Sequence, residues 1–114
     1  MKKVLCIGSV TTDVIIKPVD ALPTPGELQF IDSSSMFVGG CASNASIDLA
    51  KLGVPVSLCV KLGKDLFGHY VYDTCKEAGV DVRGCVMDEG VQTTTSIVCV
   101  NSDGERSFLY NGGS

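Results

Sequence analysis

The alternation of apolar runs with amphipathic segments in the middle of the chain constrains the fold most. Residues 42–52 place apolar side chains at helical spacing, which predicts a helix that ends at Gly53. Residues 56–62 form an apolar run typical of a strand. A second helix is predicted from Asp65, as its cap, to about Ala78. This strand–helix–strand–helix order favours an α/β sheet.

Other segments predict strands that do not all fit between the parallel members of such a sheet. The apolar run Val4–Ile7, closed by Gly8, predicts a buried strand of a parallel sheet. Further extended segments are expected at residues 12–17, 28–38, 80–87 and 94–100, and residues 107–110 complete a hairpin. We expect these later strands to form a small separate sheet that covers one end of the α/β unit like a lid.

Length and charge limit the classes of partner. A chain of 114 residues fits one domain, and its net charge of −4 with scattered Lys and Arg argues against a nucleic-acid partner. The start of the chain has too few apolar residues before Gly8 for a secretory signal. No window approaches the roughly 20 apolar residues of a membrane span. We therefore expect a cytoplasmic protein that binds neither nucleic acid nor membrane.

The six cysteines do not predict a metal site. They lack a C-x-x-C pair, and the single histidine, His69, is interpreted as a packed or surface residue of the second helix rather than a catalytic one. Cys6, Cys59 and Cys99 lie inside apolar runs, where Cys behaves as a small hydrophobic residue. The prediction is reduced thiols and no bound metal.

The strongest local signal for a binding site is the segment from Gly39 to Asn44. Two glycines let a backbone approach a ligand closely, and a following helix N-terminus offers free N–H groups. We place the helix cap near Ser43 or Asn44, and the Asn44 side chain can donate to and accept from a polyol. The alternative is a tight strand-to-helix turn with no ligand. The segment is neither a Walker A loop nor a G-x-G-x-x-G motif.

Asp13 is the second candidate. It follows the first strand, at the end of the sheet where open α/β folds bind ligands, and a carboxylate can accept hydrogen bonds from two sugar hydroxyls. The alternative is a surface carboxylate on a polar turn. Cys41 is interpreted as a small residue in a tight turn, and the hairpin-tip residues Asp103, Glu105 and Arg106 as solvated.

These segments occur in an order and spacing that resemble the ribokinase-like (PfkB) carbohydrate kinases over nearly the whole chain. No single motif is specific, but together they are. The matching segments are Gly8 to Asp13, Pro23 to Glu27, Gly39 to Ala45, Leu49 to Gly53, Gly63 to Gly68, Gly79 to Asp81, Thr93, and Asp103 to Arg106.

The resemblance implies the N-terminal part of a doubly wound α/β fold with a β-sheet lid. The α/β pieces would be about residues 1–10 and 39–79, and the lid strands about residues 12–17, 29–38 and 80–100. The resemblance also implies that Asp13, Gly39, Gly40 and Asn44 bind substrate hydroxyls. Two positions depart from ribokinase itself, which has Asn where this chain has Thr11 and Lys where it has Cys41. Both departures argue against ribose in particular.

The resemblance further implies ATP-dependent phosphorylation of a sugar, with Mg²⁺ accompanying ATP. The family's G-A-G-D element, which carries the catalytic base, does not occur in this sequence. We therefore expect the chain to be part of a longer kinase, with no catalytic residue of its own and no activity alone. A nucleoside kinase and a non-catalytic binding or dimerisation module are the alternatives. A homo-oligomer formed through the lid sheet is also expected.

Overall fold

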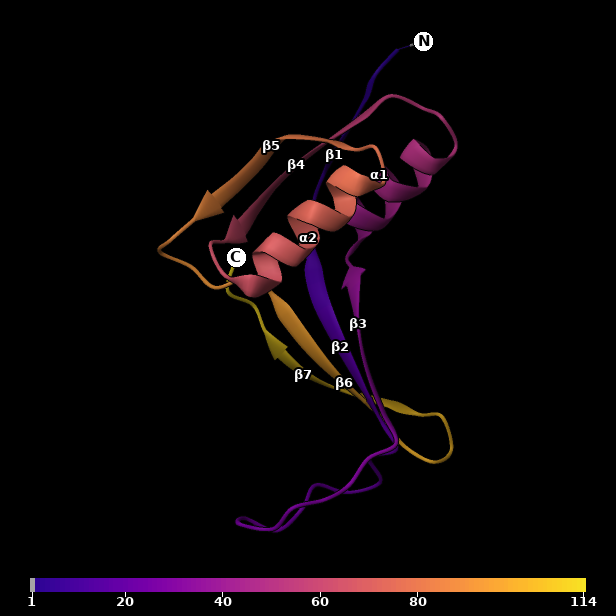
Figure 1. Ribbon diagram of the computed structural model, residues 1–114, viewed down its shortest axis with the longest axis vertical. Helices are drawn as coiled ribbons and strands as arrows, with labels where there is room; N and C mark the ends of the chain where they lie inside the picture. Colours follow the sequence, from indigo (N-terminus) through magenta and orange to yellow (C-terminus); the bar gives the residue numbers. More distant parts are fainter. Residues whose placement is uncertain (1) are drawn as a thin grey trace.

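The computed structural model describes residues 2–114, which form two sheets and two helices (Figure 1). The first sheet is parallel and contains, in spatial order, β1 (Val4–Ile7), β4 (Val56–Gly63) and β5 (Asp81–Asp88). The second sheet is mixed and contains, in spatial order, β3 (Ser33–Gly39), β2 (Thr11–Lys17), β6 (Thr95–Val100) and β7 (Arg106–Asn111). The predicted α/β class and the separate small sheet are confirmed.

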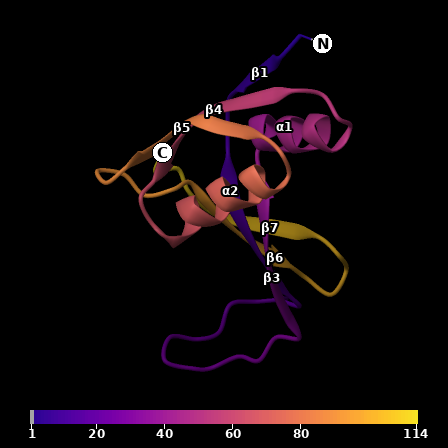
Figure 2. The ribbon, with the colours of Figure 1, turned by 45° about the horizontal axis from the view of Figure 1, so that its top comes forward.

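Helices α1 (Cys41–Lys51) and α2 (Leu66–Glu77) lie next to each other over one face of the first sheet (Figures 1 and 2). Alternate side chains of β4 point towards them, and the β4 residues Leu58 and Leu62 are fully buried, as is Val71 of α2. Burial of each such side chain contributes about 1.5–3 kcal/mol to folding. The core of the described chain therefore lies between β4 and the two helices.

The helix predictions hold, except at the start of α1. Asp65 caps α2 as predicted, since its side chain accepts the Gly68 N–H. The cap of α1 is Gly40, with φ of 92°, and not Ser43 or Asn44. Ser43 lies inside the helix, where its buried hydroxyl donates to the backbone carbonyls of Gly39 and Gly40. A serine bonded backwards in this way cannot also cap the free N–H groups ahead of it.

The prediction that Val4–Ile7 is a buried strand is only half right. β1 is a strand of the parallel sheet, but the Leu5 and Ile7 side chains are 59% and 70% exposed. Among residues 2–114, β1 pairs with β4 alone and the helices cover one face of the sheet, so side chains on the other face of β1 meet no packing partner.

The assignment of residues 80–87 to the small sheet is wrong. β5 pairs in parallel with β4, with Val60 opposite Cys85 and Leu62 opposite Met87, so it belongs to the first sheet. The chain leaves β4, forms α2 and returns beside β4, which is the ordinary βαβ connection. Val82 of β5 is buried as part of the main core.

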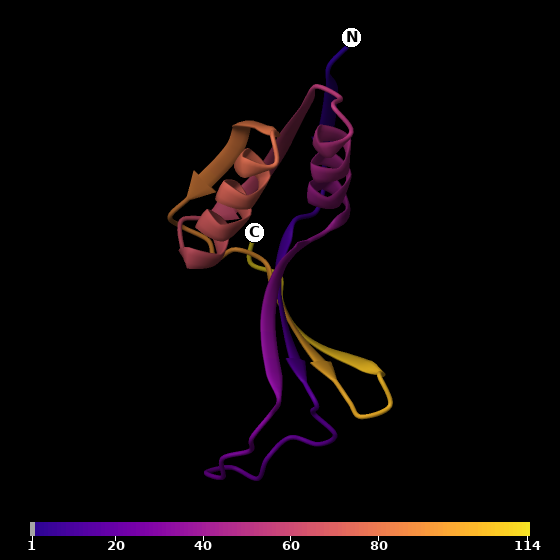
Figure 3. The ribbon, with the colours of Figure 1, turned by 45° about the vertical axis from the view of Figure 1, so that its right-hand side comes forward.

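The second sheet extends away from the helices, with the irregular segment 18–32 at its far end (Figure 3). The strand expected at residues 28–38 begins only at Ser33, so the prediction is wrong for residues 28–32, which belong to the irregular segment. Asp20 in this segment accepts the Ser102 N–H at 2.8 Å and the Ser102 hydroxyl at 2.6 Å. These bonds join the segment to the turn between β6 and β7.

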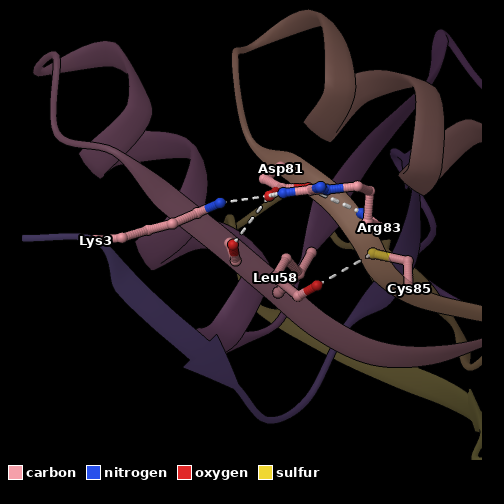
Figure 4. A network of polar contacts seen from close by, with 6 residues as sticks. Lys3, Leu58, Asp81, Arg83 and Cys85 are labelled. Carbon is pink, nitrogen blue, oxygen red and sulfur yellow. Dashed lines mark hydrogen bonds and ion pairs between the residues drawn. The ribbon is translucent and has the colours of Figure 1, made fainter.

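Asp81 is the centre of a polar network in and beside the first sheet (Figure 4). Its carboxylate pairs with Lys3 and Arg83 and accepts the Ser57 hydroxyl at 3.3 Å. Hydrogen bonds from Arg83 and Lys3 hold the pKa of the Asp81 carboxyl far below its usual range. The network therefore joins the residues before β1 to β4 and β5.

All six cysteines are free thiols. Burial raises the pKa of Cys75 and of Cys85 to about 11, so both thiols stay protonated at neutral pH. Within residues 2–114, no set of three His, Cys, Asp or Glu side chains is arranged to hold a metal ion. Neither described helix has the length and apolar character needed to span a membrane.

Candidate functional site

The Asp13 carboxylate lies half-buried on β2, next to Thr11. The two residues are two positions apart on one strand, so their side chains share a face of the second sheet. The Thr11 hydroxyl donates to Asp13 Oδ1 at 2.7 Å. This bond orients the carboxylate, and in the described chain Oδ2 accepts no hydrogen bond.

Gly39 completes a tight cluster with these two side chains. It lies directly opposite Thr11 on the neighbouring strand β3 and is buried. A Cβ at this position would lie 2.7 Å from Thr11 Oγ1 and 2.8 Å from Asp13 Cγ. The carboxylate and hydroxyl therefore occupy the space that any larger residue 39 would need.

Gly40 brings the start of α1 against the turn between β1 and β2. Its φ of 92° is in the region that glycine tolerates, and a Cβ here would lie 2.8 Å from Val10 Cα. Ser9 accepts the Ala42 N–H through its carbonyl at 3.2 Å and the Cys41 N–H through its hydroxyl at 3.4 Å. Two of the first helical N–H groups are thus already bonded within the chain.

Asn44 lies one helical turn along α1 from Gly40, whose carbonyl accepts its backbone N–H at 3.1 Å. Its side chain is exposed and makes no hydrogen bond to another described residue. The structure therefore brings Asp13, Gly39 and Gly40 into one packed cluster, and Asn44 stands beside it on the solvent side of α1.

The remaining residues considered from the sequence lie elsewhere. His69 is exposed on α2, and Cys41 is exposed at the first position of α1. The hairpin tip is bonded to itself, since the Asn101 side chain accepts the N–H groups of Asp103 and Glu105. These observations agree with the interpretation of each residue as packed or solvated.

A cavity of about 730 Å³ lies on the face of the second sheet opposite Asp13. Asp13 pairs with Phe37 and Ser96, which share its face, whereas Met36 and Ile97 line this cavity from the other face. The first turn of α2 lines it as well. A smaller cavity of about 230 Å³ lies at the turn between β1 and β2, lined by Gly8, Ser9, Val10, Lys61, Thr94, Tyr110 and Ser114.

Sequence reasoning missed two features. Thr11 was noted only as a departure from ribokinase, although its hydroxyl orients Asp13. The sequence predicts Asp65 as a helix cap and Thr93 only as part of the resemblance, although the two are bonded to each other across 28 positions. A carboxylate and a hydroxyl at such separation leave no periodic signal in the sequence.

Comparisons with known proteins agree on the family. The chain is 34% identical over 94 residues to the Arabidopsis thaliana protein named "Probable fructokinase-3", covering 81% of this chain and 27% of that protein. It is 38% identical over 72 residues to fructokinase-2 of Oryza sativa subsp. japonica, covering 63% of this chain and 21% of that one. The chain therefore spans about a quarter of the length of these relatives.

Solved structures of sugar kinases have the same fold over nearly the whole of this chain. The Arabidopsis thaliana ribokinase in complex with ribose and ATP superposes with a TM-score of 0.87 at 26% identity, over 97% of this chain and 36% of that one. The Xylella fastidiosa fructokinase with bound ATP superposes with a TM-score of 0.78 at 30% identity, over 96% and 32% of the two chains. The family described as "pfkB family carbohydrate kinase" matches residues 1–114. With the two-sheet fold, these matches show that the chain belongs to the pfkB family of carbohydrate kinases.

Proposed function

We propose that the full-length protein carrying this chain is an ATP-dependent sugar kinase, and that this chain supplies the sugar-binding and lid part. The observation that carries the proposal is the cluster of Thr11, Asp13 and Gly39 at the start of α1, in a chain whose relatives are named fructokinases. The structurally similar ribokinase was solved with ribose and ATP, which supports a sugar and ATP as the two substrates.

The proposed sugar site uses the free oxygen of Asp13. Thr11 bonds Oδ1, so Oδ2 remains available to accept a sugar hydroxyl. Hydrogen bonds to an ionised carboxylate are stronger than neutral ones. Gly39 and Gly40 let β3 and the start of α1 pack closely against Asp13 and the β1–β2 turn, which fixes the position of the carboxylate. Asn44 adds a neutral donor and acceptor at the rim. The second sheet acts as a lid that excludes water from the reaction.

The phosphate-transfer step is not assigned to residues of this chain. Phosphoryl transfer depends on positioning and charge stabilisation, and Mg²⁺ would supply part of that charge stabilisation. Residues 2–114 provide no cluster of carboxylate, His or Cys side chains suited to Mg²⁺. In this proposal, residues 2–114 hold the sugar and supply no metal ligand.

Substrate-dependent ADP production by the purified full-length protein tests the proposal. We expect ADP to form with ATP and fructose or another hexose or pentose, and to form much more slowly with adenosine. Activity with nucleosides alone would identify a nucleoside kinase instead. ATP hydrolysis that no sugar and no nucleoside stimulates would contradict the kinase proposal and favour a binding module.

We also propose that two copies associate through the second sheet. Phe37, Phe108 and Tyr110 share the Asp13 face of this sheet and are 53%, 61% and 65% exposed. Large exposed apolar patches of this kind mark interaction surfaces. Light scattering is expected to show a dimer or larger species, and Phe108→Ser should shift it towards the monomer. A monomeric wild-type protein would contradict this part.

A further inference from the structure

Two strands of the second sheet, and a residue just before a third, are hydrogen-bonded to Asp65 and the first part of α2. From β2, the buried Thr12 hydroxyl donates to the Phe67 carbonyl at 3.1 Å. On β3, the Met36 carbonyl accepts the Tyr70 hydroxyl at 2.9 Å. Just before β6, Thr93 bonds to Asp65. The two parts of the structure are therefore joined at the N-terminal end of α2, in addition to the Gly39–Gly40 turn.

Asp65 and Thr93 share two hydrogen bonds, whereas each of the other contacts has one. This pair is here called the Asp65–Thr93 junction. Thr93 donates its N–H to Asp65 Oδ2 at 2.9 Å and its hydroxyl to Oδ1 at 2.7 Å. The same hydroxyl accepts the Gly63 N–H at 2.9 Å, and Thr93 is 1% exposed. Burial raises the pKa of the Asp65 carboxyl, but the bonds from Thr93 and Gly68 outweigh it and leave the pKa below its usual range.

A helix cap alone does not account for this arrangement. Capping needs one bond, from the Gly68 N–H to Asp65, and it is present at 2.8 Å. The two further bonds go to a residue outside the helix that leads directly into β6. Asp81 provides a contrast, because its carboxylate is also well bonded but only to residues in and beside the first sheet.

The junction lies close to Asp13 along the hydrogen-bonded strands. Thr94, the residue after Thr93, accepts the Thr12 N–H at 3.0 Å through its carbonyl, and Asp13 lies opposite Ser96. Asp13 therefore stands between two attachments, the Gly39–Gly40 turn on one neighbouring strand and the junction on the other. Loss of either attachment would remove one of the contacts that hold β2 in place relative to α1.

We propose that Asp65 and Thr93 are positioning residues, which set the second sheet, and with it the Asp13 carboxylate, against the N-terminus of α1. Neither residue shares the sheet face of Asp13. Their kinetic effect rests on the proposed sugar-kinase function. A displacement of about 1 Å at a binding group far from the mutated site can lower a rate up to about a hundredfold.

Four variants of the full-length protein test the kinetic part. Asp65→Asn still caps α2 but loses an acceptor for Thr93, and Thr93→Val keeps the shape but loses the hydroxyl. Both are expected to raise the KM for the sugar about tenfold or more and to leave the KM for ATP within about twofold. Thr93→Ser restores the hydroxyl and should return the sugar KM to near the wild-type value. Asp81→Asn is the matched control and should change neither KM.

A distance measurement without substrates tests the junction independently of activity. Spin labels on non-natural residues at the exposed positions Lys76 and Ser35 report the distance between α2 and β3. We expect a broader distance distribution in Asp65→Asn than in the wild type and in Asp81→Asn.

The two measurements separate the possible failures. Equal distributions in Asp65→Asn, Asp81→Asn and the wild type would overturn the inference. So would a wild-type sugar KM in both junction variants. A wild-type protein without sugar-dependent activity would instead overturn the proposed function, and the distance measurement would still decide the role of the junction.

Discussion

Asp13→Ala is expected to lower the sugar kcat/KM of the full-length protein about ten- to a hundredfold. A charge-assisted hydrogen bond from a hydroxyl to a carboxylate contributes about 1.5–3 kcal/mol, which corresponds to that range. Part of the loss should appear in kcat, because a loosely held sugar misplaces its attacking hydroxyl. The KM for ATP should change little, since Asp13 is proposed to contact the sugar only. Steady-state kinetics with each substrate varied measures both effects.

Two comparisons make this result specific to the site. Asn44→Ala should act in the same direction and more weakly, because its hydrogen bonds are neutral. Asp48→Ala removes an exposed carboxylate from the same helix as Asn44 and should leave the sugar kcat/KM unchanged. Melting temperatures must be similar for all variants. An unchanged sugar kcat/KM in Asp13→Ala would mean that Asp13 is only a surface carboxylate and that the site lies elsewhere.

Gly68→Ala is expected to lower the free energy of unfolding by about 1–3 kcal/mol, the range for overpacking in a close-packed site. Gly68 lies inside α2, where helix propensity alone predicts that alanine stabilises by about 1 kcal/mol. The contacts around Gly68 in the structure predict the opposite effect, a loss of stability. A Cβ at Gly68 would collide with the Gly63 carbonyl and lie 2.7 Å from Thr93 Oγ1. The Gly63 carbonyl is backbone and cannot rotate away as a side chain would.

Urea denaturation of the wild type and two variants measures this effect. Gly90→Ala is the control, because its Cβ would meet only the Asp88 carboxylate, at 3.2 Å, and that flexible side chain can move. Its stability should stay close to that of the wild type. If Gly68→Ala is as stable as the wild type or more so, the close approach of α2 to the end of β4 is not as the structure describes.

Local patterns predicted the elements well where the deciding residues lie within one turn of each other. Asp65 as the cap and Ala78 as the approximate end predicted α2, and the structure confirms both, with α2 at Leu66–Glu77 and Ala78 as its C-cap. The start of α1 was misplaced because serine at position 43 has the right chemistry for a cap. Its buried side chain instead bonds backwards, which depends on the packing of Gly39 and Gly40.

The pairing of strands was predicted less well. Residues 80–87 have the composition of a strand in either sheet, and only the path of the chain through α2 places β5 beside β4. The strand–helix–strand order of the sequence favours this placement, because a strand that follows a crossover helix usually returns beside the strand before it. At the candidate site, Asp13, Gly39 and Gly40 were selected from the sequence, and their roles in binding a substrate stay predictions.

The sequence alone determined the α/β class, both helices, the existence of a separate second sheet and the resemblance to the pfkB family. All of these depend on residue types and on spacings of a few positions. Only the tertiary structure decided which sheet contains β5, that Thr11 orients Asp13 against Gly39, and that Asp65 bonds Thr93 across 28 positions. The physical reason is that most of these contacts form between strands and turns distant in sequence, whose approach depends on the packing of the whole chain and not on any local preference.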